Sequence, residues 1–98
     1  MELDLFTRSQ LLIGTESLNK LKDSHVAIFG IGGVGSFATE ALARTGVGEI
    51  TLIDYDDICI TNINRQIHAT TLTVGQSKVE IMKKRILEIN PNVKVHIY

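Results

Sequence analysis

Six consecutive residues, Gly30-Ile31-Gly32-Gly33-Val34-Gly35, combine residue types and spacing that suit phosphate binding. In such a loop we assign a sharp turn to Gly30, close approach of backbone to phosphate to Gly32, and helix packing against a strand to Gly35. The unpaired N–H groups and the dipole of the helix that follows would favour an anion. The loop, with Gly33 at its centre, therefore predicts a phosphate cradle.

The elements on either side of the loop fit this interpretation. Before it, residues 25–29 are a short apolar run of the kind that forms a buried parallel strand. After it, a helical pattern runs to Gly46-Val47-Gly48, where glycine ends the helix. One face of this helix carries Val34, Phe37, Ala38, Ala41, Leu42 and Thr45, and the other carries Ser36, Thr39, Glu40 and Arg44.

An acidic residue follows the next predicted strand. Residues 50–53 are again apolar, and Asp54 comes directly after them, nineteen residues beyond Gly35. Strand, glycine loop, helix, strand and acid occur in this order in half of a dinucleotide-binding fold, where the acid bonds the ribose hydroxyls. A turn-forming role for this carboxylate is the alternative.

A polar, irregular segment spans residues 55–73, and a loop of this length in a compact domain is usually either functional or disordered. Its isoleucines would anchor it while its amide and guanidinium groups grip phosphate. We expect Cys59 to be a buried structural thiol, because no cation lies near it in sequence. We expect His68 to act as a structural hydrogen-bond donor rather than as a proton carrier.

The remaining pattern predicts a small α/β unit. Residues 75–90 form a helix whose first turn contains Lys78, where the helix dipole disfavours a cation, so this lysine calls for a reason. Residues 93–97 alternate like a final strand. The fold class is therefore α/β, the N-terminal half of a Rossmann-like doubly wound parallel sheet. We expect residues 25–98 to be this incomplete nucleotide-binding half and residues 1–24 to be a helical arm with Thr15 as an N-cap.

Composition excludes several classes of protein. Ten basic and eleven acidic side chains leave no electrostatic footprint of a general nucleic-acid or membrane binder. A single cysteine excludes an internal disulfide or a multi-cysteine zinc site, and no metal ligand is expected among these residues. A single cysteine also fits a reducing compartment, so we expect a cytoplasmic protein, and since no stretch approaches the length of a membrane span we expect no membrane contact.

These motifs together resemble the adenylating enzymes that include ThiF, HesA, the molybdopterin-synthase adenylyltransferase and ubiquitin-activating enzyme. The resemblance covers nearly the whole chain, and the residues of these motifs are most similar to those of the tRNA threonylcarbamoyladenosine dehydratase branch. It is carried by Arg8, the glycine loop, Gly46-Val47-Gly48, Asp54-Tyr55-Asp56, Thr61-Asn62-Ile63-Asn64-Arg65-Gln66 and Thr73-Val74-Gly75-Gln76-Ser77-Lys78.

The resemblance implies an ATP site in which the loop glycines hold the nucleotide and Asp54 holds the ribose. Asn62, Arg65 and Lys78 would meet the phosphates, and Arg65 and Lys78 would supply catalytic charge. Two further nucleotide-binding residues, Asp56 and Gln66, come from the same motifs. Magnesium is implied with ATP, but the family's metal-binding aspartate and its zinc cysteines match no residue of this chain.

The implied reaction is ATP-dependent activation of the carboxylate of threonylcarbamoyladenosine in tRNA, followed by ring closure with net loss of water. Arg8 matches an arginine that dimers of this family insert into the partner's ATP site as a third catalytic cation, which implies a homodimer. The alternatives are adenylation of a sulfur-carrier protein C-terminus, as in ThiF and the molybdopterin-synthase adenylyltransferase, an NAD-binding dehydrogenase module, and a non-catalytic scaffold. A sulfur-transfer protein is a further candidate partner.

Overall fold

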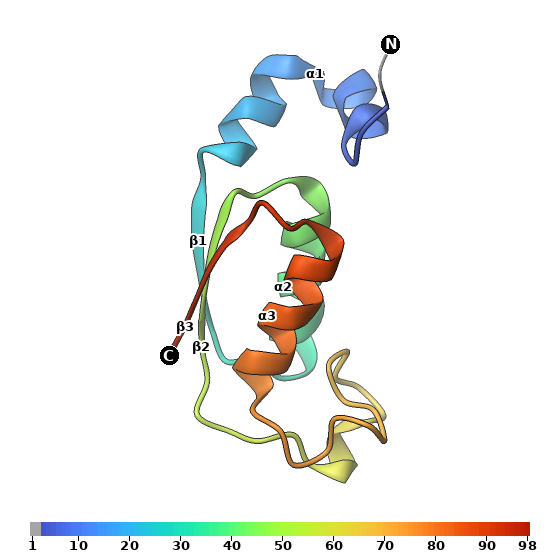
Figure 1. The fold of residues 1–98 in the computed structure, drawn as a ribbon, viewed down its shortest axis with the longest axis vertical. Helices are drawn as coiled ribbons and strands as arrows, with labels where there is room; N and C mark the ends of the chain where they lie inside the picture. The colour runs from blue at the N-terminus through green and yellow to red at the C-terminus, as the bar shows by residue number, and fades with distance from the viewer. Residues whose placement is uncertain (1–2) are drawn as a thin grey trace.

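The computed structural model describes residues 3–98, and its elements follow the predicted order (Figure 1). The helices are α1 (Thr7–Lys22), α2 (Gly33–Thr45) and α3 (Lys78–Ile89), the strands are β1 (His25–Phe29), β2 (Glu49–Ile53) and β3 (Lys94–Ile97), and a 3-10 helix, η1, spans Ile60–Asn62. Within residues 3–98 no helix combines the length and the apolar character needed to span a bilayer.

The sheet is parallel throughout and has the strand order β1-β2-β3. Both crossover helices, α2 and α3, cover the same face of it (Figure 1). This arrangement confirms the predicted Rossmann-like half, in which β2 flanks β1 and β3 lies beyond it. Strands β1 and β3 are the two edges of the sheet in the part of the chain that the structure describes.

The core lies between the sheet and these two helices. Ile50 and Leu52 point into it from the central strand, and Met82 and Ile86 meet them from α3, as the helical pattern predicts. Helix α3 begins at Lys78, three residues later than predicted. Gly75 has a left-handed φ of 89°, and Ser77 is an extended N-cap whose hydroxyl accepts a hydrogen bond from the Glu80 N–H.

Helix α2 is rotated relative to the orientation that its apolar stripe suggests. Val34 is 86% exposed and Phe37 is 53% exposed, whereas Ser36, Thr39 and Ala43 are buried. These three small side chains allow close packing, and the hydroxyls are satisfied locally: the Thr39 hydroxyl donates to the Gly35 carbonyl at 2.7 Å. Small size therefore decides which face of α2 is buried.

Helix α1 consists of two helical pieces separated by Gly14, whose φ of 87° and ψ of 165° are not helical. Thr15 directly follows this break, as an N-cap of the second piece would, but its hydroxyl accepts a hydrogen bond from the Gln10 side chain. The second piece connects directly to the sheet. A Cβ on Gly48 would lie 1.8 Å from the Lys22 carbonyl oxygen, so only glycine allows this approach.

Candidate functional site

The glycine loop joins the end of β1 to the start of α2, as predicted. Gly30 makes the turn with a φ of 91°, and its N–H donates to the Ile53 carbonyl on β2 at 2.9 Å. Gly35 lets α2 pack closely, because a Cβ there would lie 1.9 Å from the Gly30 carbonyl oxygen. The first-turn N–H groups of α2 are thus presented at the carboxyl edge of the sheet, where an α/β fold binds anions.

The middle glycines leave room for a Cβ, which would make only ordinary contacts with the polar segment. A Cβ on Gly32 would meet nothing closer than the Gln66 Nε2 at 3.8 Å, and one on Gly33 would meet the Arg65 carbonyl oxygen at 3.7 Å. Side chains at these two positions would therefore occupy the space beside the loop without clashing with the fold. Such a vacant cradle, bordered by polar groups, is suited to a phosphate chain approaching the backbone.

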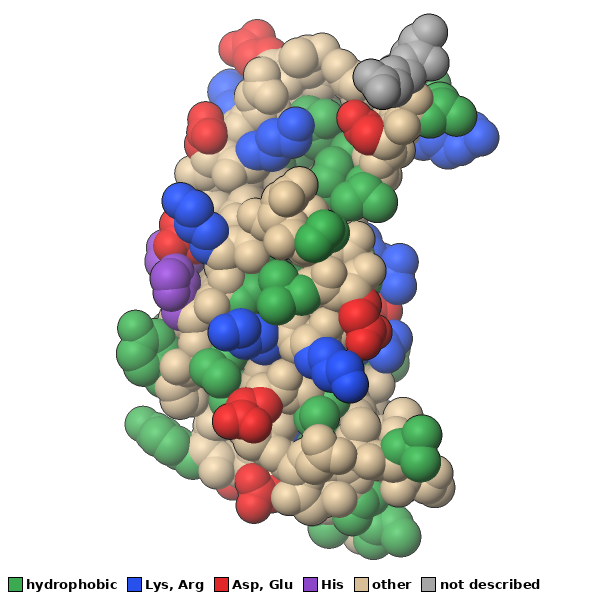
Figure 2. Space-filling model, viewed as in Figure 1, with side chains coloured by type: hydrophobic (Ala, Val, Ile, Leu, Met, Phe, Trp, Pro, Cys, Tyr) green, Lys and Arg blue, Asp and Glu red, His purple; other side chains and the backbone are tan. Residues whose placement is uncertain are grey.

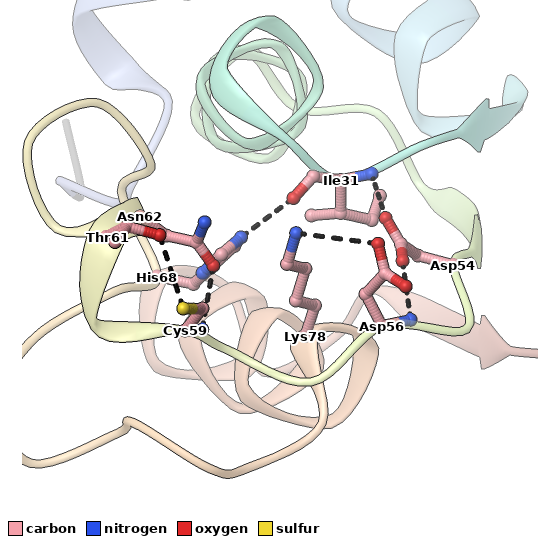
Figure 3. A network of polar contacts seen from close by, with 8 residues as sticks. All are labelled: Ile31, Asp54, Asp56, Cys59, Thr61, Asn62, His68 and Lys78. Atoms are coloured by element: carbon pink, nitrogen blue, oxygen red, sulfur yellow. Dashed lines mark hydrogen bonds and ion pairs between the residues drawn. The ribbon is translucent and has the colours of Figure 1, made fainter.

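Asp54 ties the end of β2 to this loop (Figure 3). Its Oδ2 accepts a hydrogen bond from the Ile31 N–H at 2.7 Å, and its Oδ1 accepts one from the Asp56 N–H at 2.8 Å. Each carboxylate oxygen has a second lone pair that could accept from a ribose hydroxyl. The structure thus places Asp54 beside the glycine loop, and its two backbone contacts also give it the turn-stabilising role that was the alternative.

Lys78 is buried at the N-terminus of α3 with little to neutralise it (Figure 3). It is 6% exposed, and its Nζ lies 4.0 Å from the exposed Asp56 carboxylate. Burial and the positive end of the helix dipole both disfavour an ammonium here. An anion bound beside Lys78 would compensate both costs, which gives this lysine the reason that its position requires.

The polar segment of residues 55–73 lies against the same edge. Asn62 is buried, and its Oδ1 accepts a hydrogen bond from the Cys59 N–H at 2.8 Å. Arg65 is exposed, and its Nη1 donates to the Thr61 carbonyl and to the Asn64 side chain, both at 3.0 Å. A guanidinium has five N–H donors, so Arg65 keeps donors for a ligand while it is held by its own loop.

Ser36 and His68 hold the polar segment and the glycine loop in place. The Ser36 hydroxyl accepts a hydrogen bond from the Ile67 N–H at 3.2 Å and so fastens the polar segment to α2. His68 is buried, and its Nε2 lies 2.7 Å from the Ile31 carbonyl oxygen, which confirms its expected structural role. Burial lowers the pKa of His68, although the hydrogen bond to the Ile31 carbonyl partly opposes this shift. Because a carbonyl oxygen can only accept, Nε2–H is the donor in this contact.

Two buried polar atoms lack a partner at this edge among residues 3–98, Gln66 Oε1 and His68 Nδ1. Gln66 is the side chain whose amide nitrogen lies nearest the space above Gly32. Buried polar atoms normally find a hydrogen-bond partner. An unpaired oxygen on Gln66 is consistent with a site that is completed by a bound molecule.

The expectation for Cys59 was wrong, because the thiol is exposed. It precedes η1, and the Thr61 hydroxyl lies 3.2 Å from its Sγ. That contact lowers the pKa of the Cys59 thiol. The isoleucines around it are not all anchors: Ile58 is buried, but Ile60 is exposed, so this part of the segment is only half embedded.

Arg8 does not join this constellation within the chain. It is exposed on α1, which precedes the start of β1, whereas the glycine loop follows its end (Figure 1). The two features therefore lie at opposite ends of the molecule. In residues 3–98, the side-chain cluster with metal-ligand spacing, His25, Glu49 and His96, also lies away from the loop.

Three known proteins illustrate what the chain resembles. It is 60% identical over 93 residues to the tRNA threonylcarbamoyladenosine dehydratase of Bacillus subtilis, covering 95% of the chain and 37% of that protein. The Escherichia coli tRNA N6-threonylcarbamoyladenosine dehydratase solved in complex with ATP superposes with a TM-score of 0.93 at 53% identity, covering 95% of the chain and 38% of that protein. The molybdopterin-synthase adenylyltransferase of Salmonella typhimurium is 41% identical, covering 82% of the chain and 32% of that protein.

The chain spans about a third of the length of the curated relatives it matches. The match nevertheless includes the elements described above, because the ThiF family model aligns with residues 6–98. That range contains α1, the glycine loop, Asp54, the polar segment and Lys78. The chain belongs to the ThiF family.

Proposed function

We propose that this chain forms the nucleotide-binding part of an enzyme that uses ATP to activate the carboxylate of threonylcarbamoyladenosine in tRNA. The observation that carries the proposal is the vacant cradle beside Gly32 and Gly33, with buried Lys78 and exposed Arg65 at the same edge of the sheet. The 60% identity to a dehydratase of this kind supports the choice of substrate. Such an enzyme would act in the cytoplasm, where it would meet tRNA.

A carboxylate oxygen is a poor leaving group, and the proposed chemistry converts it into a good one by bonding it to AMP. A carboxylate oxygen attacks the α-phosphorus of ATP and pyrophosphate departs. A neighbouring group of the modified nucleoside then attacks the acyl carbon, and AMP leaves with the former carboxylate oxygen, which amounts to loss of water. Lys78, Arg65 and the N–H groups of α2 would stabilise the charge on the phosphates. Asn62 and Gln66 would position the nucleotide, and Asp54 would bind its ribose.

Magnesium would accompany ATP, although Asp54 and Asp56 already contact protein groups. Both Asp54 oxygens already accept hydrogen bonds from backbone N–H groups, and the Asp56 carboxylate faces Lys78.

We also propose that the full-length protein forms a homodimer. In it, exposed Arg8 on α1 enters the partner's site, and the exposed Leu11 and Leu12 on the same helix are covered by the partner surface.

Adenylation of a sulfur-carrier protein is the second candidate, because the 41% identical relative is a molybdopterin-synthase adenylyltransferase. The test gives the full-length protein ATP and Mg²⁺ with one of three partners: tRNA bearing threonylcarbamoyladenosine, unmodified tRNA, or a sulfur-carrier protein. We expect pyrophosphate release and a dehydrated nucleoside, detected by mass spectrometry, only with the modified tRNA. Turnover only with the carrier protein, or tighter binding of NAD than of ATP in calorimetry, would reject the proposal.

A further inference from the structure

Three side chains from three adjacent strands meet on the sheet face opposite α2 and α3. His25 begins β1, Glu49 begins β2 and His96 lies in β3. The register pairs His25 with Glu49, and it pairs Thr51, which lies on the same face as Glu49, with His96. Figure 2 shows histidine side chains gathered with an acidic one on the flank of the molecule where Figure 1 has the strands.

The distances are close to those of a metal site. The His96 Nε2 lies 2.7 Å from the Glu49 Oε2, and the His25 Nδ1 lies 3.9 Å from the Glu49 Oε1. Ligand atoms about 2.0–2.1 Å from a tetrahedral zinc are roughly 3.3 Å apart. One nitrogen atom of each histidine and one carboxylate oxygen all lie within 4.8 Å of one another. Small side-chain rotations would bring all three onto one ion.

A second contact orients His25 for coordination. Its Nε2 lies 2.6 Å from the Thr51 hydroxyl. With Nε2–H donating to that hydroxyl, the Nδ1 lone pair faces Glu49 and is free to bind a cation. Metal-ligating histidines commonly hold their other ring nitrogen in such a hydrogen bond, which sets the tautomer and the ring orientation.

We propose that His25, Glu49 and His96 bind a divalent first-row transition-metal ion, with Zn²⁺ as the probe, and that the ion links the three strands. Two imidazoles and one carboxylate form a donor set that suits zinc, and water would complete the coordination. The ion replaces the hydrogen bond between His96 and Glu49. The site is separate from the glycine loop, because His25 starts β1 and the loop follows the end of that strand.

One neighbouring charge opposes the cation. Lys94 pairs with Glu49 in the register and lies two residues before His96, on the same face of β3. Its ammonium would compete for the Glu49 carboxylate, although its long side chain can move aside. A Lys94→Gln variant is therefore expected to bind zinc at least as tightly as the wild type.

The test titrates chelator-treated full-length protein with Zn²⁺ in a calorimeter and with Co²⁺ in an absorption spectrometer. We expect the wild type to bind one equivalent of Zn²⁺. The affinity for this ion should fall at least tenfold in each of His25→Gln, Glu49→Gln and His96→Gln, and should be unchanged in the carboxylate control Glu16→Gln. The same equivalent should raise the thermal unfolding midpoint of the wild type and not that of His96→Gln, since the ion binds only the folded sheet.

Comparison among variants separates this site from any cysteine site elsewhere in the protein. Cobalt bound here would show no thiolate charge-transfer band, because its ligands are nitrogen and oxygen. The three ligand residues are not deeply buried, so circular dichroism should show folded variants. Equal zinc stoichiometry and affinity in the wild type, His25→Gln and His96→Gln would overturn the proposal.

Discussion

The carbonyl oxygen of Gly30 would lie 1.9 Å from a Cβ atom on Gly35. The end of β1 and the first turn of α2 thus meet backbone to backbone, and no rotamer change can relieve the clash. At Gly32 the nearest atom to such a Cβ is 3.8 Å away. Packing within the protein therefore requires glycine at position 35, whereas at Gly32 a Cβ would make only an ordinary contact with the protein and would instead narrow the space proposed for the ligand.

Alanine substitutions should separate these two requirements. Gly35→Ala should destabilise the fold by about 3 kcal/mol or more, since overpacking against backbone is among the costliest single changes. Gly32→Ala should change stability by less than about 1 kcal/mol but weaken ATP binding. Urea unfolding and calorimetric titration with ATP measure the two effects. A stable Gly35→Ala protein, or a Gly32→Ala protein with full ATP affinity, would contradict this division.

Lys78 offers a test of phosphate contact. Removing the charge with Lys78→Gln should weaken ATP binding by about 1.5–3 kcal/mol, the range for hydrogen bonds to charged groups. The fold should lose little, because the ion pair that the buried ammonium makes within residues 3–98, with the Asp56 carboxylate, is long, at 4.0 Å. Lys84→Gln, on the exposed side of the same helix, is the matched control and should bind ATP like the wild type. Equal affinities in the two variants would leave Lys78 without a role in binding.

The order of elements could be predicted because each has a local signal that tertiary packing does not override. Two apolar runs ended at Gly30 and at Asp54, and in parallel strands these ends meet at one edge of the sheet. Lys78 was recognisable for a similar reason, since a cation in a first helical turn conflicts with the dipole. The meeting of these residues thus follows from strand direction alone.

Other features depend on contacts that no local pattern reports. The buried face of α2 is decided by how closely Ser36 and Thr39 let the helix approach its neighbours, so the apolar stripe was misleading. The exposure of Cys59 depends on how a polar segment drapes over the sheet edge. The cluster of His25 with His96 requires the strand register, because these residues are far apart in sequence.

The proposed dimer can be tested through Arg8. If Arg8 enters the partner's site, a mixed dimer of Arg8→Ala and Lys78→Gln subunits contains one site with both cations. Such a mixed dimer should regain part of the activity that each pure variant lacks, measured as pyrophosphate release. An Arg44→Ala subunit, altered at an exposed arginine on α2, serves as the active control. No recovery in a verified mixed dimer would argue against a shared site.

Glu40 joins α2 to α3 and makes stability depend on acid pH. It accepts a hydrogen bond from the Arg85 Nε and lies 3.4 Å from the Arg44 Nε. The Arg85 hydrogen bond lowers the pKa of Glu40 from 4.5. The stabilisation is therefore fully present above about pH 4.5 and is lost as the pH falls through the lower, folded-state pKa.

Glu40→Gln should lower the free energy of unfolding by about 1–2 kcal/mol at neutral pH, a value reduced for partial exposure. The difference from wild type should shrink in urea titrations repeated at decreasing pH. Arg44→Gln should cost less, because that arginine is largely exposed. If the difference in free energy of unfolding between the two proteins persists unchanged at low pH, packing of the Glu40 side chain rather than its charge stabilises the contact between the helices.

His68 predicts a second pH dependence, in a higher range. Burial lowers its pKa from 6.5. Below about pH 6.5, His68 is therefore protonated in the unfolded chain but still neutral in the folded chain. The unfolded state then binds more protons, and the free energy of unfolding falls as the pH falls, by at most about 1.4 kcal/mol per pH unit for one group. The loss continues until the pH reaches the folded-state pKa.

Protonation at Nδ1 would also place a charge beside Lys78 while Nε2 still holds the Ile31 carbonyl. Repulsion between this charge and Lys78 would push the imidazole and the hydrogen-bonded Ile31 out of position. The Ile31 N–H also donates to Asp54, so this shift would disturb the glycine loop. We therefore expect stability to decline from about pH 6.5 downward, and ATP affinity to decline only as the pH approaches the folded-state pKa, where His68 of the folded protein takes up the proton. His68→Gln, which keeps a side-chain donor but cannot titrate, should lose this extra slope in both measurements. An identical pH profile for the variant and the wild type would show that another group is responsible.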